Sequence, residues 1–149
     1  MVIEESIEIL APLQVVWGVF SAFENWKNWN TVCQSCCIVR GGEMSGGTCF
    51  QFTLRPYYLP IKVTPVIVKC EPTREVVWAG SRFGVHAEHS FTFMERDGKV
   101  IITSIETFRG FMLWVSRLIF IPRKLHRLTQ QLLRQIKEHS ESCAGGSAA

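Results

Sequence analysis

Apolar side chains recur at helical spacing through the last third of the chain, from Phe111 to about Glu141. They follow one another in steps of three and four residues, as expected for one face of an α-helix: Leu118, Ile121, Leu125, Leu128, Leu132 and Ile136. The opposite face is polar and carries Lys124, Arg127, Gln131, Arg134 and Lys137. Pro122 lies within this segment and predicts a kink or a new helix start. We therefore expect a long amphipathic helix that covers an apolar surface.

Most of the preceding chain alternates between apolar and polar positions, which is typical of strands with one buried face. The alternation and the turn residues between its segments predict strands at 2–10, 32–40, 48–55, 61–71, 75–80, 85–95 and 99–109. Pro65 lies inside the fourth of these and predicts an edge position or a bulge. Between the first two strands, residues 12–22 and 24–30 predict two short helices, the second of which could be a tight turn.

The order of elements is thus one strand, two short helices, about six strands and one long helix. Consecutive strands joined by hairpins form antiparallel sheets, so the sequence predicts an α+β fold with about seven antiparallel strands. We expect one domain over residues 1–142 and a flexible tail over 143–149. No secretory leader is recognised, and the apolar run 111–121 is too short to span a bilayer. These features predict a cytoplasmic protein without stable membrane insertion.

Composition and cysteine spacing exclude several classes of site. The chain has 149 residues, a net charge of +3 and six cysteines, which favours reduced thiols in a leaderless protein. If Cys33, Cys36 and Cys37 lie on one strand, the first and last share a face and Cys36 lies on the other. No second CxxC pair, phosphate-binding glycine loop or Ser-His-Asp set is present. We expect no metal, no cofactor and no nucleic-acid partner, and the sequence leaves the oligomeric state open.

Several short motifs occur in a characteristic order along the chain. They are Ala11-Pro12 through Val16-Trp17, Trp26 through Trp29-Asn30, Glu71-Pro72, Val77-Trp78-Ala79-Gly80, His89-Ser90-Phe91 and Glu106 through Gly110 before the terminal helix. Over residues 1–142 this pattern resembles the START-like superfamily of helix-grip proteins (SRPBCC), in particular its polyketide cyclase/dehydrase and lipid-transport group. The resemblance implies a seven-stranded sheet that grips the last helix, with a deep cavity between them. It also implies ligands such as lipids, sterols, polyketides or other apolar molecules, and in some members cyclisation or dehydration.

His89 is the polar residue of greatest interest, because the alternation of residues 85–93 places it in an apolar row. A two-residue turn at Asp97-Gly98 pairs His89 with Glu106 across the hairpin. A three-residue loop with a bulge at Gly98 instead sets His89 near Ile105. In the first register, an inward His–Glu pair could orient or protonate a bound carbonyl, which makes both residues candidate catalytic groups. The alternative is a purely structural pair.

Large apolar side chains are candidates for a ligand-binding wall. The aromatic members are Trp29, Phe50, Phe52, Trp78 and Phe91, and their alternative role is a packed core. We expect Met112, Trp114 and Leu118 to close the mouth of the cavity or to pack under the sheet edge. Three functions follow: a module that binds a small apolar ligand, a cyclase- or dehydratase-like enzyme using His89 and Glu106, or an interaction module whose interior is filled by its own aromatic side chains.

Overall fold

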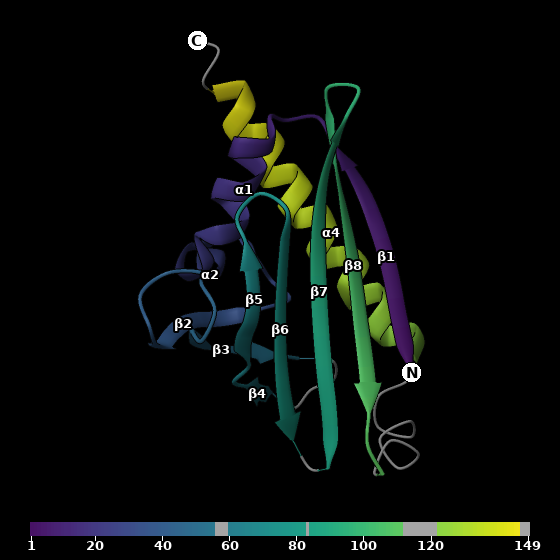
Figure 1. The fold of residues 1–149 in the computed structure, drawn as a ribbon. Coiled ribbons are helices and arrows are strands. Elements are labelled where there is room, and N and C mark those ends of the chain that lie inside the picture. Colours follow the sequence, from purple (N-terminus) through teal and green to yellow (C-terminus); the bar gives the residue numbers. More distant parts are fainter. Residues whose placement is uncertain (56–59, 83, 112–121, 147–149) are drawn as a thin grey trace.

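A computed structural model describes residues 1–55, 60–82, 84–111 and 122–146. Figure 1 shows how the elements are arranged along the chain. In chain order they are β1 (Val2–Ile9), α1 (Leu13–Ser21), the 3-10 helix η1 (Phe23–Asn25), α2 (Trp26–Trp29), β2 (Gln34–Arg40), β3 (Cys49–Leu54), β4 (Ile61–Val63), β5 (Val66–Glu71), β6 (Glu75–Arg82), β7 (Val85–Arg96), β8 (Lys99–Arg109) and α4 (Pro122–Gly146).

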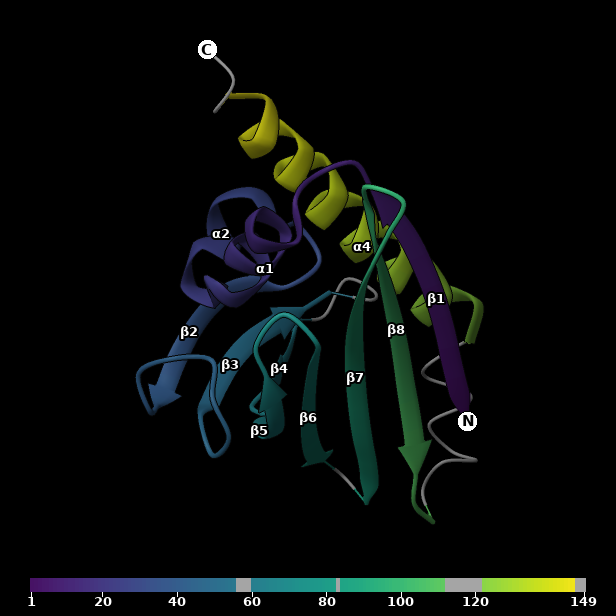
Figure 2. The same ribbon diagram turned by 45° about the horizontal axis from the view of Figure 1, so that its top comes forward.

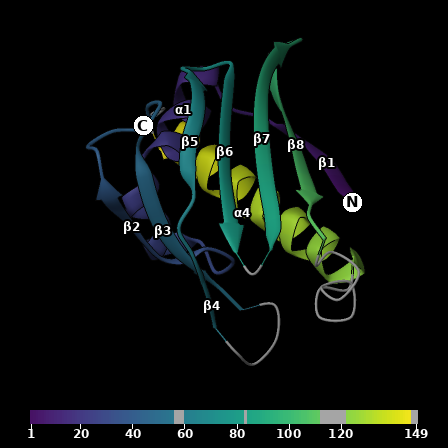
Figure 3. The same ribbon diagram turned by 60° about the horizontal axis from the view of Figure 1, so that its bottom comes forward.

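All the described strands belong to one antiparallel sheet, which confirms the predicted α+β class. Its strand order is β1-β8-β7-β6-β5-β3-β2, and β4 pairs with β3 outside this path. Pro65 separates β4 from β5, because proline cannot donate a hydrogen bond to the ladder. The sheet curves, and α4 crosses its concave side while α1 and α2 stand at one end (Figures 2 and 3). The chain therefore has the helix-grip arrangement.

The β7–β8 hairpin has the predicted two-residue turn. Asp97 and Gly98 both have positive φ angles, 53° and 73°, and Arg96 pairs with Lys99. Such angles at both central residues are those of a type I′ turn, whose twist matches that of the flanking strands. The register that follows places His89 directly across from Glu106. The three-residue alternative with a bulge at Gly98 is excluded.

Helix α4 is described from Pro122 onward, and the choice between a kink and a new helix start at this proline falls on residues outside the described structure. The predicted helix began at Phe111, which lies in a turn, and its residues 112–121 lie outside the described structure. The buried face of α4 carries Leu125, Thr129, Leu132, Leu133, Ile136 and Ser140. The helix continues to Gly146, so residues 143–146 are helical where a flexible tail was expected, and Ala144 packs against the core. Apolar contact to the core thus extends the helix beyond the point at which the sequence becomes small and polar.

The cysteines around the start of β2 do not follow the strand alternation. Cys33 and Cys36 are both buried, whereas Cys37 is exposed. Cys33 precedes the strand, Ser35 has a φ of 53°, and the pairing of β2 with β3 shifts between Gln34 and Cys37. This irregularity turns Cys36 to the same interior as Cys33. The condition of that expectation, one regular strand through all three thiols, is therefore not met.

Aromatic rings fill the space between α1 and the concave face of the sheet. Phe20 of α1 is fully buried, and its ring centroid lies 5.0 Å from Phe91, 5.0 Å from Phe93 and 6.1 Å from Trp78. Trp26 packs on the same ring at 5.4 Å and donates its indole N–H to the carbonyl oxygen of Phe20 at 3.1 Å. This part of the interior is therefore a packed core.

Truncation of Phe20 should show how strongly this core holds α1 to the sheet. We expect Phe20→Ala to lower the free energy of unfolding by about 3–5 kcal/mol, because it removes a fully buried ring and leaves a cavity. The measurement is urea denaturation followed by circular dichroism. Phe111→Ala is the matched control, since Phe111 is 80 % exposed and should change stability by less than about 0.5 kcal/mol. Equal losses in both variants would contradict the central role of Phe20.

Candidate functional site

The inner faces of the three central strands bring the predicted polar pair beside a tryptophan. Trp78 of β6 pairs with His89 of β7, and His89 pairs with Glu106 of β8. All three side chains point to the concave side because successive residues of a strand alternate between faces. The indole and imidazole centroids are 5.4 Å apart and their planes are inclined by 68°. An acid and a base thus lie next to each other on an aromatic surface.

Ser104 holds the imidazole of His89 in place. Its hydroxyl oxygen is 2.7 Å from His89 Nε2, and the residue is fully buried. The ring of Phe91 stacks on the imidazole at 4.1 Å with an interplanar angle of 28°. These contacts occupy Nε2 and one ring face, so Nδ1 is the ring nitrogen that faces Glu106. The sequence did not single out Ser104, although its position two residues before Glu106 places both on one face of β8.

Glu106 has no hydrogen-bond donor among the described residues. His89 Nδ1 lies 4.0 Å from Glu106 Oε1, which is too far for a direct hydrogen bond. The side chain of Glu106 is 20 % exposed and that of His89 is 11 % exposed. Polar groups buried to this extent are normally hydrogen-bonded. Glu106 therefore presents a mostly buried carboxyl that no described residue pairs by a hydrogen bond.

Burial shifts the pKa values of this pair in opposite directions. Desolvation lowers the pKa of His89 to about 3 and raises the pKa of Glu106 to about 7. Between those values both groups are neutral, so the interior carries no net charge there. Cys33 lies near the pair: burial, then the neighbouring Cys36 and then Glu106 raise the pKa of its thiol. The thiol is thus held in its protonated, unreactive form.

Only some of the other residues predicted to form the ligand-binding wall lie near Trp78, His89 and Glu106. Phe50 packs edge-on against Trp78 at 5.1 Å, and Phe52 stacks on Phe50 at 5.9 Å. Trp29 of α2 instead stacks on His139 of α4 at 4.9 Å and contacts Trp26. Among the described residues it has no ring contact with Trp78, His89 or Phe91. The predictions for Met112, Trp114 and Leu118 fall outside the described residues.

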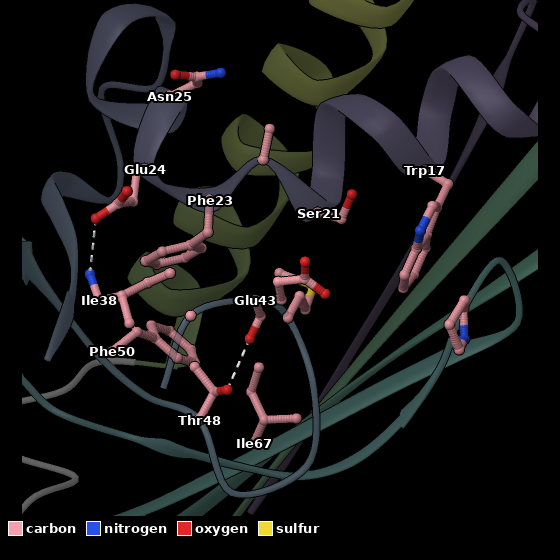
Figure 4. A pocket seen from close by; sticks show the side chains of 14 residues that line it. Trp17, Ser21, Phe23, Glu24, Asn25, Ile38, Glu43, Thr48, Phe50 and Ile67 are labelled. Carbon is pink, nitrogen blue, oxygen red and sulfur yellow. Dashed lines mark hydrogen bonds between the residues drawn. The ribbon is translucent and has the colours of Figure 1, made fainter. Parts of the chain in front are cut away.

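A separate cavity of about 470 Å³ opens between α1, η1, the β2–β3 loop and β5 (Figure 4). Its apolar walls include Trp17, Phe23, Phe50 and Ile67. None of its described lining residues belongs to α4, so it differs from the predicted cavity between the sheet and the last helix. Sequence reasoning missed it because its walls come from segments far apart in the chain, and only Phe50 was singled out beforehand.

The described residues add two further findings. No group of three His, Cys, Asp or Glu side chains within them is arranged to hold a metal ion. No helix among them is long and apolar enough to cross a membrane.

A curved antiparallel sheet around a long C-terminal helix, with polar groups set into an aromatic inner face, defines the class of helix-grip α+β proteins. A sequence profile described as polyketide cyclase / dehydrase and lipid transport matches residues 1–141. The chain therefore belongs to that family of the SRPBCC/START-like superfamily. No match is found among curated protein sequences.

Solved structures of low sequence identity share this fold. The crystal structure of TTHA0849 from Thermus thermophilus is similar with a TM-score of 0.80 and 11% identity, covering 97% of this chain and 99% of that one. The Zhui aromatase/cyclase from Streptomyces sp. R1128 has a TM-score of 0.77 and 13% identity, with 95% and 93% covered. A START superfamily protein from Mycobacterium smegmatis has a TM-score of 0.70 and 9% identity, with 97% of each chain covered.

The raised pKa of Glu106 predicts a stability difference that depends on pH. Its carboxyl stabilises the folded state fully below pH 4.5, where both states are protonated, and this contribution is lost as pH rises through about 7. Relative to Glu106→Gln, the wild type should therefore lose about 3 kcal/mol between pH 4.5 and pH 8. The measurement is urea denaturation at each pH. His89 is present in both proteins, so its own titration cancels in the difference.

Glu88→Gln is the matched control for this prediction. Glu88 lies one residue before His89 on β7 and is exposed on the outer face. Its removal should leave the difference from the wild type nearly constant with pH. A Glu106→Gln protein whose stability runs parallel to the wild type across this range would show that Glu106 ionises normally.

Proposed function

We propose that this chain binds a small apolar molecule with an oxygen acceptor at one end, held between the concave face of the sheet and α4. The observation that carries this proposal is the Glu106 carboxyl, buried to four-fifths without a hydrogen-bond donor among the described residues. An unsatisfied buried polar group costs about 1–3 kcal/mol, and a ligand atom placed beside it recovers part of that free energy. The family to which the chain belongs supports an apolar ligand, because its description names polyketide and lipid chemistry.

The protonation states of Glu106 and His89 determine which polar group the ligand should carry. Below about pH 7 the carboxyl of Glu106 is protonated and donates a hydrogen bond. His89 Nδ1 faces the same space, and the contact to Ser104 fixes the orientation of the ring. A carbonyl oxygen between these two groups would accept a hydrogen bond from Glu106 inside an apolar environment. Trp78 and Phe91 would contact the hydrocarbon part next to it.

A pair of probes that differ only in a carbonyl tests this proposal. At pH 6 we expect 2-acetylnaphthalene to bind about tenfold more tightly than 2-ethylnaphthalene, because one hydrogen bond in the site contributes about 1.4 kcal/mol. Titration followed by tryptophan fluorescence or calorimetry measures both affinities. The preference should decline as pH rises above 7 and Glu106 loses its proton.

Variants test whether Glu106 and His89 cause the preference for the carbonyl compound. Glu106→Ala and His89→Ala should bind the two probes with nearly equal affinity while remaining folded, whereas Glu88→Ala on the outer face should keep the wild-type preference. If neither probe binds the wild type, the proposed apolar site is refuted. If both bind but the carbonyl gives no advantage, the site stands and the roles of Glu106 and His89 are refuted.

The second candidate function is catalysis of a dehydration or cyclisation. The observation that favours it is the pKa of Glu106, which burial places near 7, where a carboxyl can both donate and accept a proton. His89 has a pKa of about 3 and is a poor base, so it would position the substrate oxygen. Glu106 would carry the proton in this scheme.

A β-hydroxyketone tests the enzymatic alternative. In 4-hydroxy-4-phenylbutan-2-one, loss of an α-proton and of the hydroxyl as water forms a carbon–carbon double bond, which is detected by the absorbance of the conjugated ketone. We expect a catalyst acting through Glu106 to lose at least 100-fold in rate on Glu106→Gln. A wild-type rate equal to that of Glu106→Gln would leave binding as the function and remove catalysis.

A further inference from the structure

The cavity between α1, η1 and the β2–β3 loop is separate from the His89–Glu106 site. None of its described lining residues belongs to β7, β8 or α4. Phe50 lines it, Trp78 packs behind Phe50 at 5.1 Å, and His89 lies beyond Trp78 at 5.4 Å. Two packed rings thus stand between this cavity and the polar pair. Its volume of about 470 Å³ is within the range of small-molecule sites.

The inner part of this cavity is apolar and firmly packed. Phe50, Ile67 and Phe23 are 2 %, 1 % and 4 % exposed, and the rings of Phe23 and Phe50 contact each other at 4.3 Å. Trp17 stands at the other side, where its ring packs edge-on against Phe93 at 5.4 Å. Figure 4 shows Phe23 and Phe50 on one side of the cavity, Trp17 on the other and Glu43 between them.

The charged groups of the cavity are all acidic. Glu24 and Glu43 line it, and its described lining contains no lysine, arginine or histidine, although the whole chain has a net charge of +3. Neither carboxylate forms an ion pair with a described residue. Glu24 Oε1 accepts a hydrogen bond from the N–H of Ile38 at 3.3 Å, which ties it to β2 (Figure 4). The opening therefore carries two carboxylates that have no ion-pair partner among the described residues.

The loop that carries Glu43 is held in one shape by hydrogen bonds. The hydroxyl of Thr48 donates to the carbonyl oxygen of Glu43 at 2.7 Å, and the N–H of Ser45 donates to the same oxygen at 2.9 Å. Gly47 donates its N–H to the carbonyl oxygen of Ile67 at 2.7 Å, which ties the loop to β5. The backbone that carries Glu43 is thus anchored within the loop and to β5.

From these features we propose that the cavity binds a small aromatic ammonium compound. The ring would lie against Phe50 and Ile67, and the cation would lie beside Glu43, while Glu24 adds negative charge at the same opening (Figure 4). Trp17 offers an aromatic face to the same cation, a contact that favours ammonium groups over neutral or anionic ones. An anionic ligand would be repelled by both carboxylates, and a neutral one would lack the attraction to them.

Three indole derivatives that differ in charge test this proposal. Tryptamine carries an ammonium group at pH 7, tryptophol is neutral, and indole-3-propionate is an anion. Titrations followed by two-dimensional NMR report both affinity and location. We expect tryptamine to bind three- to tenfold more tightly than tryptophol, and indole-3-propionate to bind least. The shifted amides should belong to α1, η1 and the β2–β3 loop, and the preference for tryptamine should weaken at high salt.

Variants assign the preference to the two carboxylates. The double variant Glu24→Gln, Glu43→Gln should bind tryptamine and tryptophol alike, and glutamine at position 24 keeps an oxygen that can accept the N–H of Ile38. Glu95→Gln, at an exposed position near the β7–β8 turn, should behave as the wild type. Equal affinity for the three compounds, an unchanged double variant, or shifts confined to β7 and β8 would each overturn the proposal. None of these outcomes bears on the carbonyl preference proposed for the His89–Glu106 site.

Discussion

The register of the β7–β8 hairpin is the constraint on which the rest of the interior depends. Because side chains alternate along a strand, a slip of one residue would turn His89, Phe91 and Phe93 to the outer face. The turn at Asp97-Gly98 prevents this slip by fixing Arg96 opposite Lys99. Strand β1 then pairs with β8 residue by residue, from Val2 with Thr107 to Ile9 with Val100. The turn thus sets which side chains of β7 and β8 face the concave side of the sheet.

The same register explains why a polar row is tolerated inside. On the inner side of β8 the order is Ile102, Ser104 and Glu106. The β7 residues opposite them are Phe93, Phe91 and His89, in that order. Phe20 covers the two phenylalanines, so the aromatic core ends where the polar side chains begin. Isolated charges in such surroundings would be costly, and the pKa shifts of His89 and Glu106 allow both to stay neutral. Burial therefore creates a site that offers hydrogen bonds without charge.

Local patterns in the sequence predicted most of the secondary structure and the pairing of the last two strands. The alternation of 85–95 and 99–109 and the Asp-Gly pair between them predicted the hairpin and the His89–Glu106 pairing. The irregular start of β2 was not predictable, because the positive φ of Ser35 is an unusual conformation for a residue other than glycine. Ser104 was overlooked because a serine in a strand gives no signal until its partner on the next strand is known. The cavity beside Glu43 depends on contacts between distant segments, which periodicity does not report.

Phe50 and Trp78 separate two environments of opposite chemical preference. On the side of His89 the available group is a neutral carboxyl that donates a hydrogen bond, and an oxygen acceptor is the complementary partner. On the side of Glu43 the charged groups are two carboxylates, which cannot donate a hydrogen bond to the same oxygen when ionised. A cation, conversely, would favour the ionised form of Glu106 and oppose the desolvation that keeps it neutral. Because the rings between them are packed edge to face, each environment keeps its own preference within a single small domain.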